Sequence, residues 1–252
     1  MFKFDIFHLL DLSFELAYGC DPLSQADRKT ILAIFPHADD EISCVGTMTN
    51  HVIRGDRVVL CFATHGEMTS LMGDVSEEEI ILAREEHAAK VAEIIGCEVM
   101  FLDFKDTEVE ITRKNAKKIA GVISEIKPDA IITWNIYHRH PDHRSIAQLV
   151  IDAVTMARIP RVVDPNGPHR KDITIIQYHD ERALLPSIYV DVSQTIHKIK
   201  EVTQCYAETY GWKGAVERVA VRRMSTGMEC DVEYAERFTI LRRRHKPVRY
   251  IV

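Results

Sequence analysis

The sequence has no uncharged run of the roughly 18 apolar residues that a membrane-spanning helix needs. Its six cysteines are widely spaced and form no Cys-x-x-Cys pair, which argues against a thiolate zinc site and against a disulfide framework. These absences predict a chain that does not span a membrane and that works in a reducing, cytoplasmic setting.

Glycine-rich phosphate-binding loops are also missing. No Gly-x-Gly-x-x-Gly follows the first predicted strand, and no Gly-Lys-Ser or Gly-Lys-Thr loop occurs. A net charge of −6, with basic residues scattered along the chain, gives no electrostatic footprint for a nucleic-acid backbone. The one basic cluster, residues 242–246, is interpreted as a solvated C-terminal face. The sequence therefore predicts no nucleic-acid partner.

Length and composition are those of an ordinary globular protein. The 252 residues, 46 % hydrophobic and 28 % charged, are enough for one large α/β domain with a substantial core. Residues 1–28 begin with an apolar stretch that acidic residues interrupt, without the basic start of a signal peptide. We expect an N-terminal helical extension at 1–28, packing on the domain or on a partner subunit of a homo-oligomer. A single α/β domain is expected at 29–252.

Short apolar runs alternate with helical patterns along the chain. Strands are predicted at 30–35, 57–64, 99–102 and 130–134, and helices at 41–54, 76–96, 112–126 and 144–158. This alternation predicts an α/β fold with a Rossmann-like, mostly parallel sheet and helices on both faces. Beyond Pro160 the pattern weakens to an irregular C-terminal extension, with strands near 173–178 and 187–190 and helices at about 193–209 and 231–242.

Two short motifs rich in histidine and aspartate follow predicted strands. His-Ala-Asp-Asp-Glu occupies residues 37–41, and His-Pro-Asp-His occupies residues 140–143. Parallel sheets place ligand sites beyond the carboxyl ends of their strands, so both motifs are expected at the same edge of the sheet. The strand order that would bring them together is not readable from the sequence.

The side chains of these motifs suit a catalytic divalent metal. Two imidazoles and one carboxylate, from His37, His143 and Asp40, make a three-ligand set that leaves positions open for water and substrate. Asp39 would remain free to take a proton from the metal-bound water. The residues therefore indicate a metal-dependent hydrolase.

The remaining polar residues of the second motif have candidate roles as well. His140 could stabilise a developing oxyanion or protonate a leaving group, and Asp142 could orient that imidazole. Taken singly, each motif could also be structural, as the acidic first turn of a helix or as a surface turn. A non-haem Fe(II) oxygenase could use the same His/Asp/His ligands, although it would not need a neighbouring base such as Asp39.

The sequence resembles the LmbE-like or PIG-L-like N-acetylglucosaminyl deacetylases. That family typically shows His-Pro-Asp-Asp-Glu after the first strand and His-Pro-Asp-His in a later loop. The resemblance covers about residues 29–242, and it includes Gly46-Thr47, Thr64-His65-Gly66-Glu67, Arg84-Glu85-Glu86 and Lys127-Pro128-Asp129.

This resemblance implies a zinc-dependent hydrolysis of the acetamide on an N-acetylglucosamine-containing small molecule, with release of acetate and a free amine. The positions that match the family's metal ligands are His37, Asp40 and His143. The matching positions for the general base, for the oxyanion-stabilising or general-acid histidine, and for residues that hold or frame the sugar are Asp39, His140, Arg84 and Asp106.

Two positions depart from the family pattern. Ala38 replaces the usual proline, which relaxes the backbone between the expected ligand and the expected base. His138 stands where some relatives carry a tyrosine that helps to polarise the amide, and we expect it to contact the substrate. Tyr137 is one residue away and is the alternative for that role.

Overall fold

The computed structural model describes residues 28–242. The predicted N-terminal extension at 1–28 and the basic cluster at 242–246 therefore lie almost entirely outside the described residues. Within residues 28–242, every helix is too short or too polar to cross a lipid bilayer.

A seven-stranded mixed sheet forms the centre of the described chain. Its strands in spatial order are β3 (Glu98–Phe101), β2 (Arg57–Phe62), β1 (Thr30–Phe35), β4 (Ala130–Thr133), β5 (Thr174–Tyr178), β7 (Ala235–Arg242) and β6 (Ser187–Asp191). The pairs from β3 to β5 are all parallel, and β7 runs antiparallel to both of its neighbours. The predicted Rossmann-like, mostly parallel sheet is confirmed.

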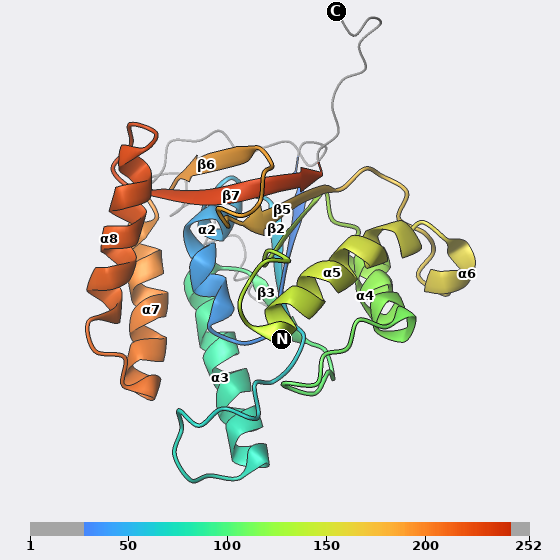
Figure 1. Cartoon of the computed structure of the whole chain (residues 1–252), viewed down its shortest axis with the longest axis horizontal. Helices are drawn as coiled ribbons and strands as arrows, with labels where there is room; N and C mark the ends of the chain where they lie inside the picture. Colours follow the sequence, from blue (N-terminus) through green and yellow to red (C-terminus); the bar gives the residue numbers. More distant parts are fainter. Residues whose placement is uncertain (1–27, 243–252) are drawn as a thin grey trace, which may run out of the picture.

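Helices cover both faces of this sheet (Figure 1). One face carries α4 (Arg113–Ile126), α5 (Pro141–Met156) and α6 (Pro160–Val163), and the other carries α2 (Val45–Ile53), α3 (Glu77–Ile95), α7 (Ile196–Tyr210) and α8 (Ala215–Met228). Along β1, Leu32 and Ile34 join the first core cluster, whereas Ala33 and Phe35 join the second. This two-residue period, with both faces buried, explains why β1 reads as a continuous apolar run.

The ends of the predicted helices follow local capping signals. Ser76 and Glu79 form a capping box at the start of α3, and Gly96 ends that helix in a left-handed conformation with a φ of 83°. Thr112 accepts a hydrogen bond from the backbone N–H of Asn115 and caps α4. These boundaries agree with the sequence prediction because capping depends on residues three or four positions apart.

The C-terminal third is more regular than the sequence predicts, and the helix expected at 231–242 is wrong. Those residues include β7, which pairs with β5 and β6, and the preceding α8 was not predicted. Phe238 packs into the core on one side of the sheet while Leu241 packs on the other. Pairing with two neighbouring strands overrides the helix propensity of the charged residues in this segment.

Two further boundaries differ near the motifs. The helix expected at 41–54 is divided into a short 3-10 helix, η1 (Asp40–Ser43), and α2, with a break at Cys44. The helix expected from residue 144 begins at Pro141, a residue suited to a first helical turn. His143 therefore lies on a helix and not in the loop.

The strand order creates a switch point beside β1. The chain runs outward from β1 to β2 and β3, and then returns to place β4 on the other side of β1. In open α/β sheets, ligands bind in the crevice beyond the carboxyl ends of the two strands at such a point. Because one motif follows β1 and the other follows β4, both lie at this crevice.

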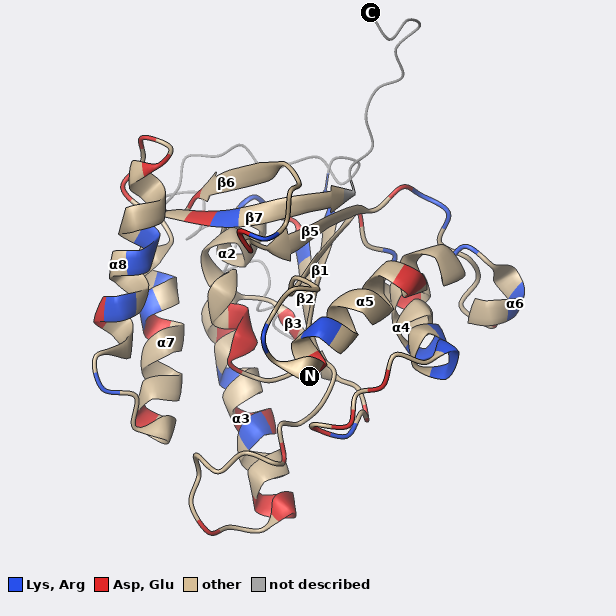
Figure 2. Cartoon of the chain, in the orientation of Figure 1, with Lys and Arg blue, Asp and Glu red and all other residues tan. Residues whose placement is uncertain are grey.

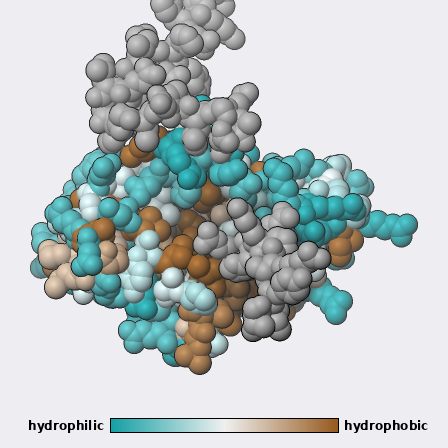
Figure 3. Space-filling view, turned by 90° about the horizontal axis from the view of Figure 1, so that it is seen from above, coloured by the Kyte–Doolittle hydropathy of each residue, from teal (hydrophilic) through white to brown (hydrophobic). Residues whose placement is uncertain are grey.

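Charges are distributed over the whole visible molecule. Blue segments of Lys and Arg and red segments of Asp and Glu are both scattered over the elements on the two sides of the sheet in Figure 2. Seen from above, hydrophilic residues cover most of the surface, and hydrophobic residues gather near the middle and the lower edge (Figure 3).

Close packing of α2 against the α7 side of the sheet gives a direct test of the fold. A Cβ atom on Gly46 would lie 2.6 Å from Cγ1 of Val192, so Gly46→Ala is expected to lower the free energy of unfolding by about 1–3 kcal/mol. The matched control is Gly121→Ala in α4, where a Cβ atom would meet nothing within 4 Å beyond its chain neighbours and the helix backbone; its expected effect is a gain of about 0.5–1 kcal/mol. Urea unfolding measures both, and an unchanged Gly46→Ala stability would contradict this packing.

Candidate active site

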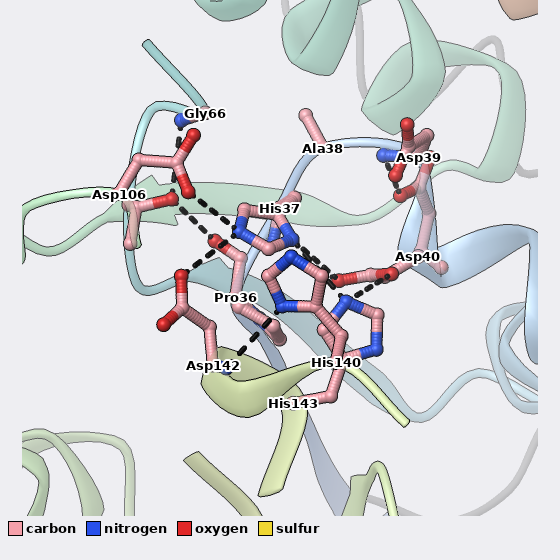
Figure 4. A network of polar contacts seen from close by, with 12 residues as sticks. Pro36, His37, Ala38, Asp39, Asp40, Gly66, Asp106, His140, Asp142 and His143 are labelled. Atoms are coloured by element: carbon pink, nitrogen blue, oxygen red, sulfur yellow. Dashed lines mark hydrogen bonds and ion pairs between the residues drawn. The ribbon is translucent and has the colours of Figure 1, made fainter. Parts of the chain in front are cut away.

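His37 is the centre of a polar network at the carboxyl end of β1 (Figure 4). Its Nε2 atom lies 3.0 Å from Oδ1 of Asp106 and 3.4 Å from Oδ2 of Asp142, and its backbone N–H donates to Oδ2 of Asp40 at 3.0 Å. Two carboxylates at Nε2 favour the tautomer that carries its proton there. The lone pair of Nδ1 then points to the other side of the ring.

Donor atoms of three residues converge on that other side, with Asp40 offering a different oxygen to each histidine. Nδ1 of His37 lies 3.3 Å from Nε2 of His143, which lies 3.4 Å from Oδ1 of Asp40. Nδ1 of His37 is 3.7 Å from Oδ2 of Asp40. Two ligand atoms that are each about 2.1 Å from a tetrahedral ion lie about 3.4 Å apart, so this spacing fits a single divalent cation.

Other donors surround this trio. Within the described chain, two groups of three residues offer donor atoms that all lie within 4.8 Å of one another: His37 with His140 and His143, and His37 with Asp106 and Asp142. Both groups contain His37. The first group shares His37 and His143 with the trio, whereas the second lies on the Nε2 side of the His37 ring.

Burial governs the charges of these groups. Burial raises the pKa of Asp40 to about 8, and the adjacent charge of Asp39 adds to the shift. Burial and the neighbouring His138 lower the pKa of His143 to about 2, so that imidazole is neutral. Burial alone would lower the pKa of His37, but its hydrogen bonds to Asp106 and Asp142 raise it to about 10. At neutral pH a pKa of about 10 keeps both nitrogens of His37 protonated, and a pKa of about 8 favours the protonated form of Asp40. A bound cation would displace the proton from Nδ1 of His37 and from the carboxyl group of Asp40, because metal ligands have to be deprotonated.

The backbone of Asp39 is held in an unusual conformation. Its φ of 134° lies in the region that favours glycine. Oε2 of Glu41 accepts the N–H of Asp39 at 2.9 Å, and the Arg84 guanidinium donates to the carbonyl of Ala38. Both bonds are made by the single peptide group between Ala38 and Asp39, which they fix on the N-terminal side of the strained residue.

Arg84 and Asp106 contact residues of the first motif. Arg84, on α3, is 3 % exposed, with its Nη1 atom 3.6 Å from Oδ2 of Asp39 and its guanidinium 4.8 Å from the ring centre of Tyr210. The second carboxylate oxygen of Asp106 accepts the N–H of Met68 at 3.1 Å. Both side chains contact protein groups, and their expected role in holding or framing a sugar stays a prediction.

The second motif begins α5 at the same crevice. His140 is the N-cap residue, and its Nδ1 atom accepts the backbone N–H of Asp142 at 3.3 Å. The carboxylate of Asp142 instead accepts the N–H of Thr107 at 2.8 Å and faces His37. The expected orientation of His140 by this carboxylate is therefore replaced by a backbone contact, because the helix starts at Pro141 and directs the side chain toward the loop after β3.

Aromatic rings wall the site on the His143 side. The imidazole of His138 stacks on that of His143, with centroids 4.2 Å apart and planes at 17°. The Trp134 ring also stacks on His143, with centroids 4.8 Å apart. His138 thus lies against the imidazole of His143, and Tyr137 is the more exposed of the two neighbours, at 42 %.

Some residues of the network were not singled out from the sequence. Glu41 is fully buried and Glu67 is 6 % exposed; Glu67 accepts the N–H of Asp106 at 3.0 Å. Both residues lie within segments that resemble the family, so the resemblance could have pointed to them. Tyr206 of α7, which opposes the burial-driven rise in the pKa of Glu41, is more than 160 residues away along the chain and has no such signal.

Comparison with known proteins adds to this geometry. The family description "GlcNAc-PI de-N-acetylase" (PIG-L) matches residues 32–154, a stretch that contains both motifs. A diacetylchitobiose deacetylase of Thermococcus kodakarensis is 34 % identical over 68 % of this chain and 66 % of its own length. A probable N-acetyl-α-D-glucosaminyl L-malate deacetylase of Bacillus anthracis is 25 % identical over 84 % of this chain and 93 % of its own.

The fold has solved counterparts as well. The N,N'-diacetylchitobiose deacetylase of Pyrococcus horikoshii superimposes with a TM-score of 0.77, covering 95 % of this chain and 94 % of that chain at 21 % identity. The architecture, the two motifs and the sequence matches agree, and the chain belongs to the LmbE/PIG-L-type deacetylase family.

Proposed function

We propose that this protein is a zinc-dependent deacetylase that removes the N-acetyl group from an N-acetylglucosamine-containing small molecule. The observation that carries the proposal is the convergence of His37, Asp40 and His143 within 3.3–3.7 Å, with Asp39 beside them. Relatives named for diacetylchitobiose and for an N-acetylglucosaminyl malate support the substrate class, since both names contain an N-acetylated amino sugar.

His37, Asp40 and His143 would hold the metal ion in this mechanism. When bound, a divalent ion acts as a Lewis acid and lowers the pKa of a water molecule. In the neutral form of His37, Asp106 and Asp142 keep the single proton on Nε2, so that Nδ1 presents its lone pair toward the site.

Asp39 is the proposed general base. Its side chain remains 21 % exposed while its backbone is fixed by Glu41 and its carboxylate is paired with Arg84. Asp39 accepts one proton from the attacking water, whose oxygen bonds to the acetamide carbonyl carbon. Cleavage of the C–N bond then releases acetate, and the leaving nitrogen takes up a proton to become the free amine.

His140 is the proposed partner of the oxyanion or of the leaving amine. Its ring lies 5.1 Å from that of His37 and 4.8 Å from that of His143, at the start of α5. The backbone N–H of Asp142 is bonded to Nδ1, which leaves Nε2 to face substrate. His138 and Tyr137 are the proposed substrate contacts at the adjacent wall.

An acetate-release assay tests the proposed activity. We expect zinc-loaded protein to release stoichiometric acetate and amine from at least one member of a panel of N-acetylglucosaminides, including diacetylchitobiose. Asp39→Asn keeps the shape of the side chain but cannot accept the proton, so its kcat should fall about 10²–10⁴-fold with zinc content unchanged. Oxygen uptake without acetate release would instead indicate an Fe(II) oxygenase, and a loss below about tenfold in Asp39→Asn would place the base elsewhere.

Metal content tests the ligand assignment separately from activity. Replacing His37, Asp40 or His143 by alanine should empty the site, because each change removes one of three converging donors. His140→Ala serves as the matched control in the second motif and should retain stoichiometric zinc while lowering kcat more than it raises KM. Elemental analysis of the four purified variants decides the matter. Equal zinc loss in His140→Ala and His143→Ala would make His140 a ligand.

A further inference from the structure

The break between η1 and α2 has no local cap. Cys44, at the N-cap position of α2, has a φ of −142° and no side-chain hydrogen bond to the helix. The N–H groups in the first turn of a helix have no partner within the helix. Those of Gly46 and Thr47 are buried, so they need acceptors from elsewhere in the chain.

Glu236 supplies those acceptors from β7. Its Oε1 atom accepts the N–H of Gly46 at 3.1 Å, and its Oε2 atom accepts the N–H and the hydroxyl of Thr47 at 2.9 and 2.6 Å. Glu236 is 1 % exposed. Burial raises the pKa of this carboxyl, while Arg223 and the donors on Thr47 and Gly46 oppose that shift. Both oxygens act only as acceptors, which is the role of a carboxylate at the positive end of a helix.

Arg223 joins this carboxylate to the other side of the break. Its Nε atom lies 3.4 Å from Oε1 of Glu236, and its Nη2 atom donates to the carbonyl of Ile42, in η1, at 2.8 Å. Arg223 comes from α8 and is 5 % exposed. Figure 1 shows the start of β7 beside α8 and next to α2. One buried ion pair therefore holds the end of η1 and the beginning of α2 in a fixed relation.

We propose that Glu236 and Arg223 are positioning residues for the catalytic segment 37–41. Asp40 is the first residue of η1, and Arg223 fixes the carbonyl two residues later. The strained Asp39 immediately precedes η1, so a shift of η1 would displace both the proposed ligand and the proposed base. Neither Glu236 nor Arg223 belongs to the donor cluster, and neither lies in a motif. The inference rests on the proposed function, because segment 37–41 is catalytic only if that function is correct.

The substitution Glu236→Gln isolates this contact. A carboxamide places an NH₂ group at one of the two oxygen positions, and donors already face both positions. Every flip of the amide therefore sets donor against donor. Because misplacement of reacting groups by about 1 Å can cost about a hundredfold, we expect kcat to fall at least about tenfold while KM changes less than about threefold.

A second readout measures the position of Asp40 without turnover. The affinity of the purified protein for Zn²⁺, by competition with a chromophoric chelator, should fall at least about tenfold in Glu236→Gln and in Arg223→Lys, as expected for residues that support ligands. Arg223→Lys keeps the charge but loses the paired contacts to Ile42 and Glu236. The matched control is Glu229→Gln, which breaks the partly exposed pair of Glu229 with Arg237 and should change neither kcat nor zinc affinity.

All assays are run below the unfolding temperature of each variant. Should Glu236→Gln not fold, Thr47→Val removes only the 2.6 Å hydroxyl contact and is measured in the same way. Values of kcat and zinc affinity within about twofold of the unchanged protein, in variants that show a lowered melting temperature, would make the pair purely structural and overturn the proposal. An unchanged protein that binds zinc but releases no acetate would instead reject the proposed function. The zinc affinities of the variants would still decide the positioning role.

Discussion

The structure depends on burying several carboxylates beside histidines at the carboxyl ends of β1 and β4. Asp40 illustrates the constraint, since burial and the nearby Asp39 raise its pKa to about 8. Carboxylates so placed are unfavourable unless cations, protons or hydrogen-bond donors compensate their charge. The surrounding elements supply that compensation, and the arrangement of their donors explains much of what encloses the site.

The compensating groups come from parts of the chain that are distant in sequence. Arg84 of α3 pairs with Asp39, and the loop after β3 donates the N–H of Thr107 to Asp142. Both contacts come from residues outside the His37, Asp40 and His143 trio. This division separates the groups that would meet substrate from those that hold them in place, as preorganised sites require.

The strained backbone of Asp39 is connected with the different roles proposed for two neighbouring carboxylates. Two neighbouring carboxylates, Asp39 and Asp40, have to point to different places if one is to bind a cation and the other is to accept a proton. The φ of 134° at Asp39 achieves this divergence, and the contacts from Glu41 and Arg84 maintain it. Ala38 stands in place of the proline that is usual in the family, and its backbone carbonyl accepts the hydrogen bond from Arg84.

The sequence by itself determined the elements whose signals are local. The apolar run of β1, the capping box at Ser76 and the glycine that ends α3 all depend on residues a few positions apart. It also determined that each motif follows a strand, and the donor types in those motifs limited the chemistry. Tertiary structure decided that β1 and β4 are neighbours, that the carboxylate of Asp142 turns to His37, and that residues 235–242 form a strand. These outcomes depend on contacts between segments that are about a hundred residues apart in the chain. A local sequence pattern does not contain the energy of such contacts.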